Sequence, residues 1–166
     1  MERAREAGIA VSFDVNYRAK LWAVPNAAPV LTELARIADV VICTREDAER
    51  VFGVTGTCAE VRDEIARSLD ADVVVVTDGE RGAWWRRGDS SGSVDAMAVM
   101  VIDRLGAGDA FAAGVIDGML DGDLEAGIRR GTALAAVALT TRGDQVRVTR
   151  AELEALLEGH GWRVDR

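Results

Sequence analysis

The sequence predicts an α/β fold in which helices cover both faces of a mainly parallel sheet. Three short β-branched runs support this fold class, at residues 9–14, 38–43 and 71–79. None of them alternates with polar residues, as is typical of strands that are buried on both faces. Helical patterns separate the runs, and strands that alternate with helices pair in parallel through crossover connections. We expect a single domain over residues 1–166, the usual size for one hydrophobic core.

The helices between these strands are recognised by their ends and their apolar faces. Gly8 is expected to end a short N-terminal helix, and the segment from Pro29 onward has apolar residues at helical spacing. A capping box of Thr57 and Glu60 begins the next helix. The residues expected to face inward from the last two helices are Leu31, Leu34, Ala35, Ala38, Val61, Ile65 and Leu69.

After Gly79 the pattern changes to extended chain. Residues 82–100 form two extended runs around a turn rich in Gly, Ser and Asp, which predicts an antiparallel hairpin at the sheet edge. Trp84 and Trp85 point to opposite faces of such a strand. We therefore expect both rings to pack inside the protein rather than to stack on a ligand.

The remainder of the chain is predicted to be helical. A helix begins at Gly108, residues 128–139 are apolar almost all round and form a buried helix, and a capping box of Thr149 and Glu152 begins a last helix that ends near Gly159. In the first of these helices Asp117 and Asp121 lie away from the apolar face. The apolar faces consist of Phe111, Val115, Gly118 and Met119 in that helix and Leu153, Leu156 and Leu157 in the last.

Charge and composition exclude several classes of protein. A net charge of -8 argues against nucleic acid or an anionic membrane as a partner. The apolar run at residues 133–139 is too short to span a bilayer, and the charged start does not resemble a signal peptide. We expect a cytoplasmic protein. Cys43, Cys58 and His160 are the only residues of their types, which excludes a disulfide framework and a Cys/His metal set, and both cysteines are expected to be packing residues.

The stretch DRLGAGDAF, residues 103–111, combines a glycine-rich turn with an aspartate. It is neither a Walker loop, which needs Lys and Ser or Thr, nor a dinucleotide fingerprint, which needs glycine where Phe111 stands. Gly106, Ala107 and Gly108 at a helix start would leave N–H groups pointing outward as an anion hole. Asp109 beside it could take a proton from an alcohol during phosphoryl transfer. From these residues alone, a simple turn with a capping acid explains the pattern equally well.

Three segments resemble a known family. DRLGAGDAFAAG is similar to the Asp-Thr-x-Gly-Ala-Gly-Asp signature of the ribokinase-like (phosphofructokinase-B type) sugar kinases, with Arg104 where many members have Thr. FDVNYRAKLW and TTRGDQVRVTRAEL resemble the 2-keto-3-deoxygluconate kinases in particular. The resemblance implies a three-layer αβα fold and ATP-dependent phosphoryl transfer to a hydroxyl of a sugar or sugar acid, above all 2-keto-3-deoxygluconate. Ribokinase or fructokinase activity is the alternative within this family.

The resemblance also implies roles for the glycine loops. Asp109 would be the catalytic base, and the residues from Gly106 to Gly108 would form the anion hole. Thr77, Gly79 and Gly82 would line the phosphates and ribose of ATP, because glycines at the end of a strand let a ligand approach the backbone closely. A purely structural turn is the alternative for these glycines.

Substrate and metal contacts are implied at four further positions. Asn16 and Arg18 would lie near the substrate and the γ-phosphate, although a surface salt bridge is the alternative for Arg18. Asp47, with Thr44, stands where the family more often has an Asn-x-x-Glu motif that organises Mg²⁺. Asp103 would help to hold a monovalent cation, and a turn-forming role is its alternative.

Family members are roughly twice as long, beyond the 100–200 residues expected of one domain, so the chain corresponds to their C-terminal half. The N-terminal half, with the lid that closes over the sugar, would be absent. Two interpretations stay open. In the first, the chain retains kinase chemistry, with an N-terminal half that is supplied separately or missing through a misplaced start codon, and a homo-oligomer is a further partner arrangement that we consider. Alternatively, it is a non-catalytic half that binds nucleotide or pairs with a partner through the exposed edge of the strand at residues 9–14.

Overall fold

The computed structural model describes residues 1–159, so His160 lies outside the described part of the chain. The chain divides into two compact units, Met1–Ser93 and a second unit from Val94 onward. We describe each unit by itself. Among the described residues, no helix is both long enough and apolar enough to cross a membrane.

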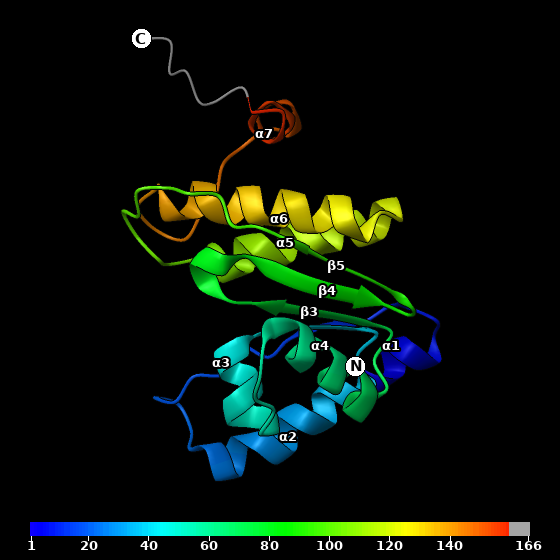
Figure 1. The fold of residues 1–166 in the computed structure, drawn as a ribbon. Coiled ribbons are helices and arrows are strands. Elements are labelled where there is room, and N and C mark those ends of the chain that lie inside the picture. Colours follow the sequence, from blue (N-terminus) through cyan, green and yellow to red (C-terminus); the bar gives the residue numbers. More distant parts are fainter. Residues whose placement is uncertain (160–166) are drawn as a thin grey trace. The chain divides into compact units, whose positions relative to one another are not determined.

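The first unit contains a mixed five-stranded sheet with the order β1-β2-β3-β4-β5 (Figure 1). Strands β1 (Ser12–Asp14), β2 (Val40–Thr44) and β3 (Val73–Thr77) pair in parallel, and β4 (Ala83–Arg87) pairs antiparallel with β3. Strand β5 (Ser90–Val94) follows a two-residue turn and forms the opposite edge from β1. The predicted parallel sheet with an antiparallel hairpin at its edge is therefore confirmed.

The first unit contains four α-helices and two short helical turns of other types, and the sequence analysis did not predict these two turns. The α-helices are α1 (Glu2–Glu6), α2 (Val24–Ile37), α3 (Arg45–Asp47) and α4 (Cys58–Leu69). A π-helical turn, η1 (Ala48–Phe52), follows α3, and a 3₁₀ turn, η2 (Gly79–Arg81), joins β3 to β4. Helix α4 begins with the predicted capping box, in which Thr57 and Glu60 bond each other's backbone N–H groups.

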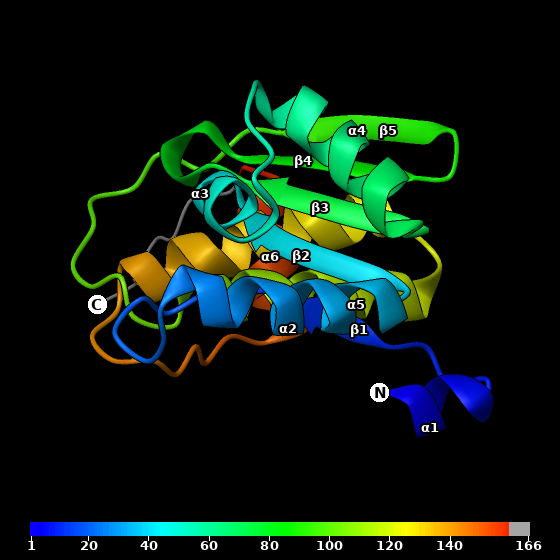
Figure 2. The same cartoon turned by 90° about the horizontal axis from the view of Figure 1, so that it is seen from below.

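Helices α2 and α4 cover one face of the sheet (Figure 2). Alternate residues of β2 and β3 point into this core, because successive side chains of a strand face opposite sides. The core residues contributed by the two strands and the two helices include Val41, Cys43, Val74, Val76, Leu31, Ala35, Val61 and Ile65. Both cysteines are buried, as expected of small packing residues.

The predicted bounds are wrong at three places. Strand β1 begins at Ser12 rather than at residue 9, because Ile9 is 60% exposed and the chain has not yet entered the sheet. Helix α2 begins at Val24, five residues before the predicted start, since Pro25 lies in its first turn, where no backbone donor is needed. Strand β5 ends at Val94, and residues 95–100 form no strand.

The two tryptophans of β4 lie on opposite faces of the sheet, as predicted. Trp84 packs against the core beneath α2 and α4. Trp85 is buried, and its indole lies so close to Gly92 of β5 that a Cβ at that glycine would be 2.9 Å from Nε1. Both rings therefore serve packing within the sheet.

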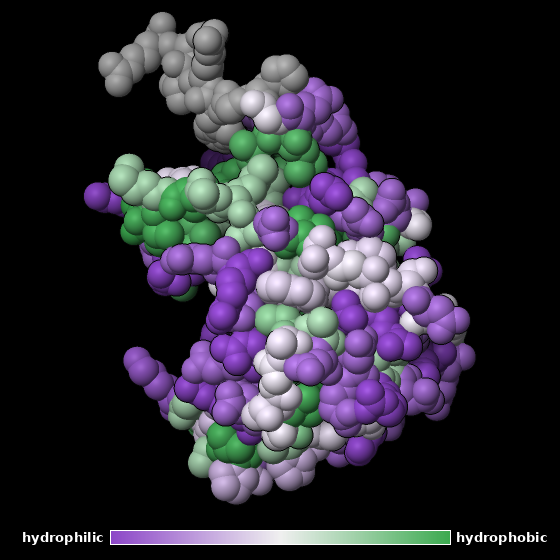
Figure 3. All heavy atoms as spheres, in the orientation of Figure 1, coloured by the Kyte–Doolittle hydropathy of each residue, from purple (hydrophilic) through white to green (hydrophobic). Residues whose placement is uncertain are grey.

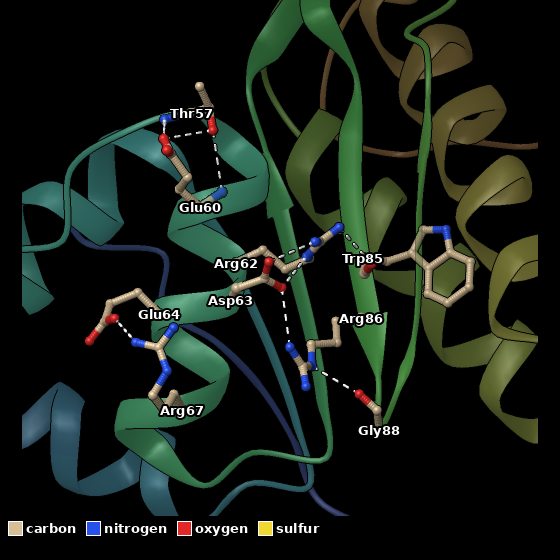
Figure 4. A network of polar contacts seen from close by, with 9 residues as sticks. All are labelled: Thr57, Glu60, Arg62, Asp63, Glu64, Arg67, Trp85, Arg86 and Gly88. Atoms are coloured by element: carbon tan, nitrogen blue, oxygen red, sulfur yellow. Dashed lines mark hydrogen bonds and ion pairs between the residues drawn. The ribbon is translucent and has the colours of Figure 1, made fainter.

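A polar network joins α4 to β4 (Figure 4). The buried Arg62 donates to the Trp85 carbonyl oxygen at 3.3 Å and forms two hydrogen bonds to Asp63, at 2.9 and 3.0 Å. Arg86 reaches the same carboxylate at 3.4 Å and donates to the Gly88 carbonyl at 2.9 Å. These contacts lower the pKa of Asp63, first through the hydrogen bond from Arg62. The network ties the edge hairpin to the helix layer.

The second unit consists of α5 (Ala107–Asp121), α6 (Leu124–Leu139) and α7 (Arg150–Leu157). Figure 1 shows α5 and α6 side by side. Their backbones approach each other at four glycines, and a Cβ on any of these would meet the facing backbone at 2.6 Å or less. The glycines of this contact are Gly114, Gly118, Gly127 and Gly131. Of the predicted apolar face, Phe111, Val115 and Gly118 are buried and Met119 is half-buried.

The predicted polar side of α5 anchors the last helix. Asp117 accepts from Arg150 of α7 at 2.7 Å and pairs with Arg130 of α6 at 2.6 Å. Asp121 pairs with Arg130 at 3.0 Å. Helix α7 begins with the predicted capping box of Thr149 and Glu152. The acidic side of α5 therefore faces two arginines rather than only solvent.

Candidate functional site

The carboxyl ends of the three parallel strands bring one group of predicted residues together in the first unit. Thr44 and Thr77, the last residues of β2 and β3, are partners in the sheet register. Asn16 and Arg18 follow β1 at the same edge, since the Val15 N–H still bonds Ile42 of β2. Ligands in open α/β sheets bind outside this edge. The register therefore assembles a polar rim where the sequence placed a ligand.

A depression of about 360 Å³ lies just after β1, and its lining includes both predicted substrate residues. Asn16 is exposed and has φ +38, a left-handed conformation that few residues other than glycine adopt. Arg18 is exposed beside it. The wall is apolar and held in place by a hydrogen bond of 2.9 Å from the Tyr17 hydroxyl to the Trp22 carbonyl. The remaining lining residues are Val15, Leu21 and Leu31.

Asp47 is enclosed at the same edge, with 8% of its surface exposed. Its backbone N–H donates to the Thr44 hydroxyl at 2.9 Å, which caps α3. Burial raises the pKa of the Asp47 carboxyl, while hydrogen bonds from Thr44 and the Tyr17 backbone and the charge of Arg18 act in the opposite direction. The aspartate thus links the end of β2 to the segment that carries Arg18.

Thr77, Gly79 and Gly82 lie in a closed loop between β3 and β4. The loop is closed by a 2.9 Å hydrogen bond from the Asp78 N–H to the Gly82 carbonyl oxygen. Gly79 has φ +54 and Gly82 has φ +103, both in the region that favours glycine. The backbone conformation of the turn therefore requires glycine at both positions. This requirement is compatible both with a loop that contacts ATP and with a purely structural turn.

The second group of predicted residues lies in the second unit, at the start of α5. Gly106 is the N-cap of this helix and adopts φ +77, and the first intrahelical bond is donated by Ala110. Among residues 1–159 no side chain caps the helix there, so the N–H groups of Ala107 and Gly108 keep the outward direction of unpaired helix-terminal donors. Asp109 is exposed in the first turn. This helix start is compatible with the predicted anion hole, and it places a carboxylate in the first turn.

Asp103 supports this helix start. Its carboxylate accepts from the Leu105 N–H at 3.1 Å and from the Gly143 N–H at 3.2 Å. These backbone hydrogen bonds, first the one from Leu105, hold the pKa of Asp103 below its usual range. Gly106 in turn lies directly against the backbone of Asp144. The loop at residues 141–144 therefore packs against the glycine turn and stabilises it.

The segment before α5 exposes apolar side chains that the sequence analysis did not single out, and of these only Met100 was assigned to the predicted hairpin. Figure 3 shows apolar surface in this part of the second unit. The exposed residues of this segment are Met100, Val101, Ile102 and Leu105. Exposed apolar groups that follow one another in this way mark contact surfaces more often than isolated ones do.

The carboxylates offer little direct coordination for a metal ion. Within residues 1–159, no group of three or more His, Cys, Asp or Glu side chains lies close enough to hold one. Asp47 and Asp103 are both engaged by hydrogen-bond donors. Mg²⁺ commonly takes one or two protein carboxylates and completes its shell with water and substrate phosphates. The carboxylates present therefore fit an Mg²⁺ ion that is bound mainly by water and substrate phosphates, rather than one that is enclosed by protein ligands.

Comparison with known families decides the identity of the chain. A model described as pfkB family carbohydrate kinase matches residues 1–151. The chain belongs to the pfkB family of carbohydrate kinases. The matched range includes both groups of residues described above. The family assignment confirms the resemblance noted from the sequence.

Individual pfkB relatives agree with this assignment. A 2-dehydro-3-deoxygalactonokinase of Haloferax volcanii is 33% identical over 167 residues, which cover 100% of this chain and 52% of the relative. The crystal structure of 2-dehydro-3-deoxygluconokinase from Thermotoga maritima is 29% identical with a TM-score of 0.87, over 95% of this chain and 52% of that one. The ribokinase-like fold class is therefore confirmed. The chain spans about half the length of these relatives.

A third pfkB relative was solved with ligands. A double mutant of fructokinase from Vibrio cholerae O395, in a form bound to fructose, ADP and potassium ion, is 29% identical with a TM-score of 0.79. The match covers 93% of this chain and 52% of the fructokinase. Two kinds of sugar substrate are thus named among the relatives of this pfkB chain.

The structure also contains a charged group that the sequence analysis did not select. Asp78, in the loop between β3 and β4, pairs with Arg45 of α3 and with Arg81 of η2, each at 2.9 Å. Cys58 at the start of α4 donates to the same oxygen at 3.4 Å. Only the turn sequence TDGERG hinted at this arrangement, because the partners lie 20 and 33 residues away.

Proposed function

We propose that this chain supplies the nucleotide-binding and phosphoryl-transfer part of an ATP-dependent sugar-acid kinase. The observation that carries the proposal is the start of α5, where outward N–H groups and the exposed carboxylate of Asp109 lie within one helical turn. An anion hole beside a general base is the arrangement that phosphoryl transfer to an alcohol requires. Family membership supports the same reaction class.

In the proposed reaction, Asp109 accepts the proton of the acceptor hydroxyl as its oxygen attacks the γ-phosphorus of ATP. The bond from the γ-phosphorus to the bridging oxygen breaks, and ADP leaves with the electron pair. The N–H groups of Ala107 and Gly108 stabilise negative charge on the transferred group, helped by the positive end of the helix dipole. Thr77, Gly79 and Gly82 are proposed to contact the phosphates and ribose of ATP.

The metal ions are proposed to act mainly through the substrate. Mg²⁺ would neutralise charge on the ATP phosphates, with Asp47 near its water shell. A monovalent cation near Asp103 would stabilise the helix start, and the potassium ion in the fructokinase structure supports this assignment.

We propose a 2-keto-3-deoxy sugar acid, 2-keto-3-deoxygluconate or its galactonate epimer, as the acceptor. The depression after β1 presents Arg18 beside the polar Asn16 and an apolar wall that includes Trp22. A guanidinium binds a carboxylate through two parallel hydrogen bonds, and a neutral sugar such as fructose has no group that uses this charge. The names of two relatives, a galactonokinase and a gluconokinase of this substrate type, support the same class. We place the reaction in the cytoplasm, where ATP is available.

The first experiment is calorimetric titration of the chain with ATP and Mg²⁺, followed by an assay of ADP release with 2-keto-3-deoxygluconate, its galactonate epimer, fructose and ribose. We expect ATP binding, and turnover only with the two sugar acids. Asp109→Asn should reduce turnover by roughly 10²–10⁴ while leaving ATP affinity nearly unchanged. Asp89→Asn, an exposed aspartate in the turn between β4 and β5, is the matched control. Equal turnover in both variants would remove Asp109 from the mechanism.

A second function, binding of a partner chain, is favoured by a separate observation. The segment before α5 exposes Met100 and Leu105, and β1 is an edge strand. Such surfaces pair with other chains. If the chain is a non-catalytic half or forms a homo-oligomer, sedimentation velocity should show self-association or binding to a second protein, and Met100→Gln with Leu105→Gln should weaken it. ATP binding without turnover would favour this second function over the first.

A further inference from the structure

The Asp78 carboxylate lies at the centre of a cationic cluster at the carboxyl edge of the sheet. One carboxylate oxygen, Oδ2, is within 2.9 Å of both Arg45 Nε and Arg81 Nη2 and accepts from Cys58. Two guanidinium groups on one carboxylate leave one excess positive charge. The Asp78 side chain is only 16% exposed, whereas the side chains of Arg45 and Arg81 are 36% and 67% exposed. The excess charge therefore faces outward, over a counter-ion that is less exposed than either arginine.

The ionisation states in the cluster are well defined. Partial burial opposes ionisation of Asp78, but the hydrogen bonds from Cys58, Arg45 and Arg81 hold its pKa below the usual range. Burial, together with the hydrogen bond to Asp78, raises the pKa of Cys58 to about 11, so that the thiol stays protonated and donates. Asp78 is thus a charged acceptor shared by three donors from three different elements.

The cluster is attached to the loop that is proposed to contact ATP. Asp78 directly follows Thr77, and its N–H closes the loop on Gly82. Arg81 lies within the loop, and Arg45 directly follows Thr44, the register partner of Thr77. Figure 2 shows α3 and this loop at the same end of the sheet. The two guanidinium groups therefore flank the backbone that carries the proposed nucleotide contacts.

We propose that Arg45 and Arg81 bind the phosphate groups of the nucleotide and that Asp78 is the positioning residue that holds both arginines at the loop. This inference rests on the proposed kinase function and assigns it a phosphate-binding pair. Arginine suits the task because its planar fork keeps one edge on Asp78 while the other donates to a phosphate oxygen. A phosphate arriving here would meet the excess positive charge without having to displace the less exposed carboxylate of Asp78.

The test measures the affinity of the folded chain for ATP and for inorganic tripolyphosphate by calorimetry. Arg81→Gln and Arg45→Gln should each weaken both ligands roughly tenfold, because each removes a charge-assisted hydrogen bond. The control is Arg87→Gln, an exposed arginine of β4 that pairs with Val73 at the other end of the sheet. It removes the same charge far from the loop and should leave both affinities unchanged.

Asp78→Asn separates positioning from simple charge. The variant makes the cluster more positive, so that electrostatics alone predicts tighter binding, whereas a positioning role predicts weaker binding of both ligands. Tighter or unchanged binding by a folded Asp78→Asn chain would overturn the positioning role. If this variant fails to fold by circular dichroism, the two arginine variants still decide the phosphate contacts.

The remaining outcomes distinguish this inference from the proposed function. ATP binding by the wild-type chain with equal affinities in the three arginine variants overturns the inference and leaves the kinase function standing. Loss of ATP binding with unchanged tripolyphosphate binding also overturns it, because the contact would then be to the nucleoside. No ATP binding by the folded wild-type chain overturns both.

Discussion

Gly106 lies against the backbone of Asp144, and a Cβ built on it would stand 2.8 Å from the Asp144 carbonyl oxygen and 3.0 Å from its Cα. The same glycine has φ +77 as the N-cap of α5. Two separate constraints, one conformational and one steric, therefore require glycine at the start of the proposed anion hole.

We expect Gly106→Ala to lower the free energy of unfolding by about 2–4 kcal/mol, from the left-handed conformation and the overpacked contact together. Chemical denaturation measures this change. Gly108→Ala is the matched control for stability, because a Cβ there meets nothing within 4 Å and the residue lies inside the helix. It should be neutral or stabilising by up to about 1 kcal/mol. Equal stabilities of the two variants would contradict the role of the Asp144 contact.

The glycine contact between α5 and α6 should be equally intolerant of added atoms. A Cβ on Gly114 would stand 2.2 Å from the backbone nitrogen of Gly131, and a helix backbone cannot shift as a flexible side chain can. Gly114→Ala should cost about 3 kcal/mol or more by separating the helices. Thermal unfolding followed by circular dichroism provides the measurement, with Gly108→Ala of the same helix as reference. Because 1 kcal/mol shifts the Tm of a chain of 150–250 residues by about 2–4 °C, a Tm within about 2 °C of wild type would show that the helices are not in close contact.

Arg62 and Arg67 lie on the same helix but differ in burial. Arg62 is buried and bonds the Trp85 carbonyl and Asp63, whereas Arg67 is exposed and pairs with Glu64 (Figure 4). Arg62→Ala should destabilise the chain by about 2–3 kcal/mol, because it removes the hydrogen bonds of a buried guanidinium to the Trp85 carbonyl and to Asp63. Arg67→Ala should change stability by less than about 0.5 kcal/mol. Urea unfolding of both variants tests the difference, and similar costs would argue against the network.

Asp47 predicts a pH dependence of stability. Burial raises its pKa in the folded chain, so the folded state binds its proton more tightly than the unfolded state does. The contribution of Asp47 to the free energy of unfolding is therefore fully present below the ordinary aspartate pKa. It is lost as the pH rises through the raised pKa of the folded chain. In Asp47→Asn this decline should disappear. Denaturant titrations of both proteins between pH 3.5 and 7 give the comparison, and parallel curves would show that Asp47 is not desolvated.

Local sequence patterns were sufficient for several elements. The runs that became β2 and β3 consist of β-branched residues apart from Cys43, and the capping boxes at Thr57 and Thr149 are formed as predicted. The start of β1 was wrong because the apolar Ile9 looks like a strand residue although it precedes the sheet. The π-helical turn η1 was not foreseen, since its residues show no periodicity that distinguishes it from a loop.

The residues of the candidate site likewise divide into those that local sequence patterns predict and those that they do not. The glycine turn before α5, its first-turn acid and the family resemblance were readable from the sequence, because these contacts join residues a few positions apart. The partners of Asp78 and the support of Asp103 by Gly143 were not, because they join residues up to 40 positions apart. The depression around Arg18 likewise depends on how the chain folds back after β1.

The sequence by itself determined the α/β class, the parallel strands, the helix caps and the residues of the helix-start motif, since hydrophobic periodicity and capping are local properties of a chain. Only the tertiary structure decided that Arg45 and Arg81 share one carboxylate, that four glycines bring α5 and α6 into contact, and that Asp144 excludes a side chain at Gly106. These relationships arise from close packing and from the pairing of charges on distant parts of the chain. Both depend on which distant residues meet, and no local pattern encodes that.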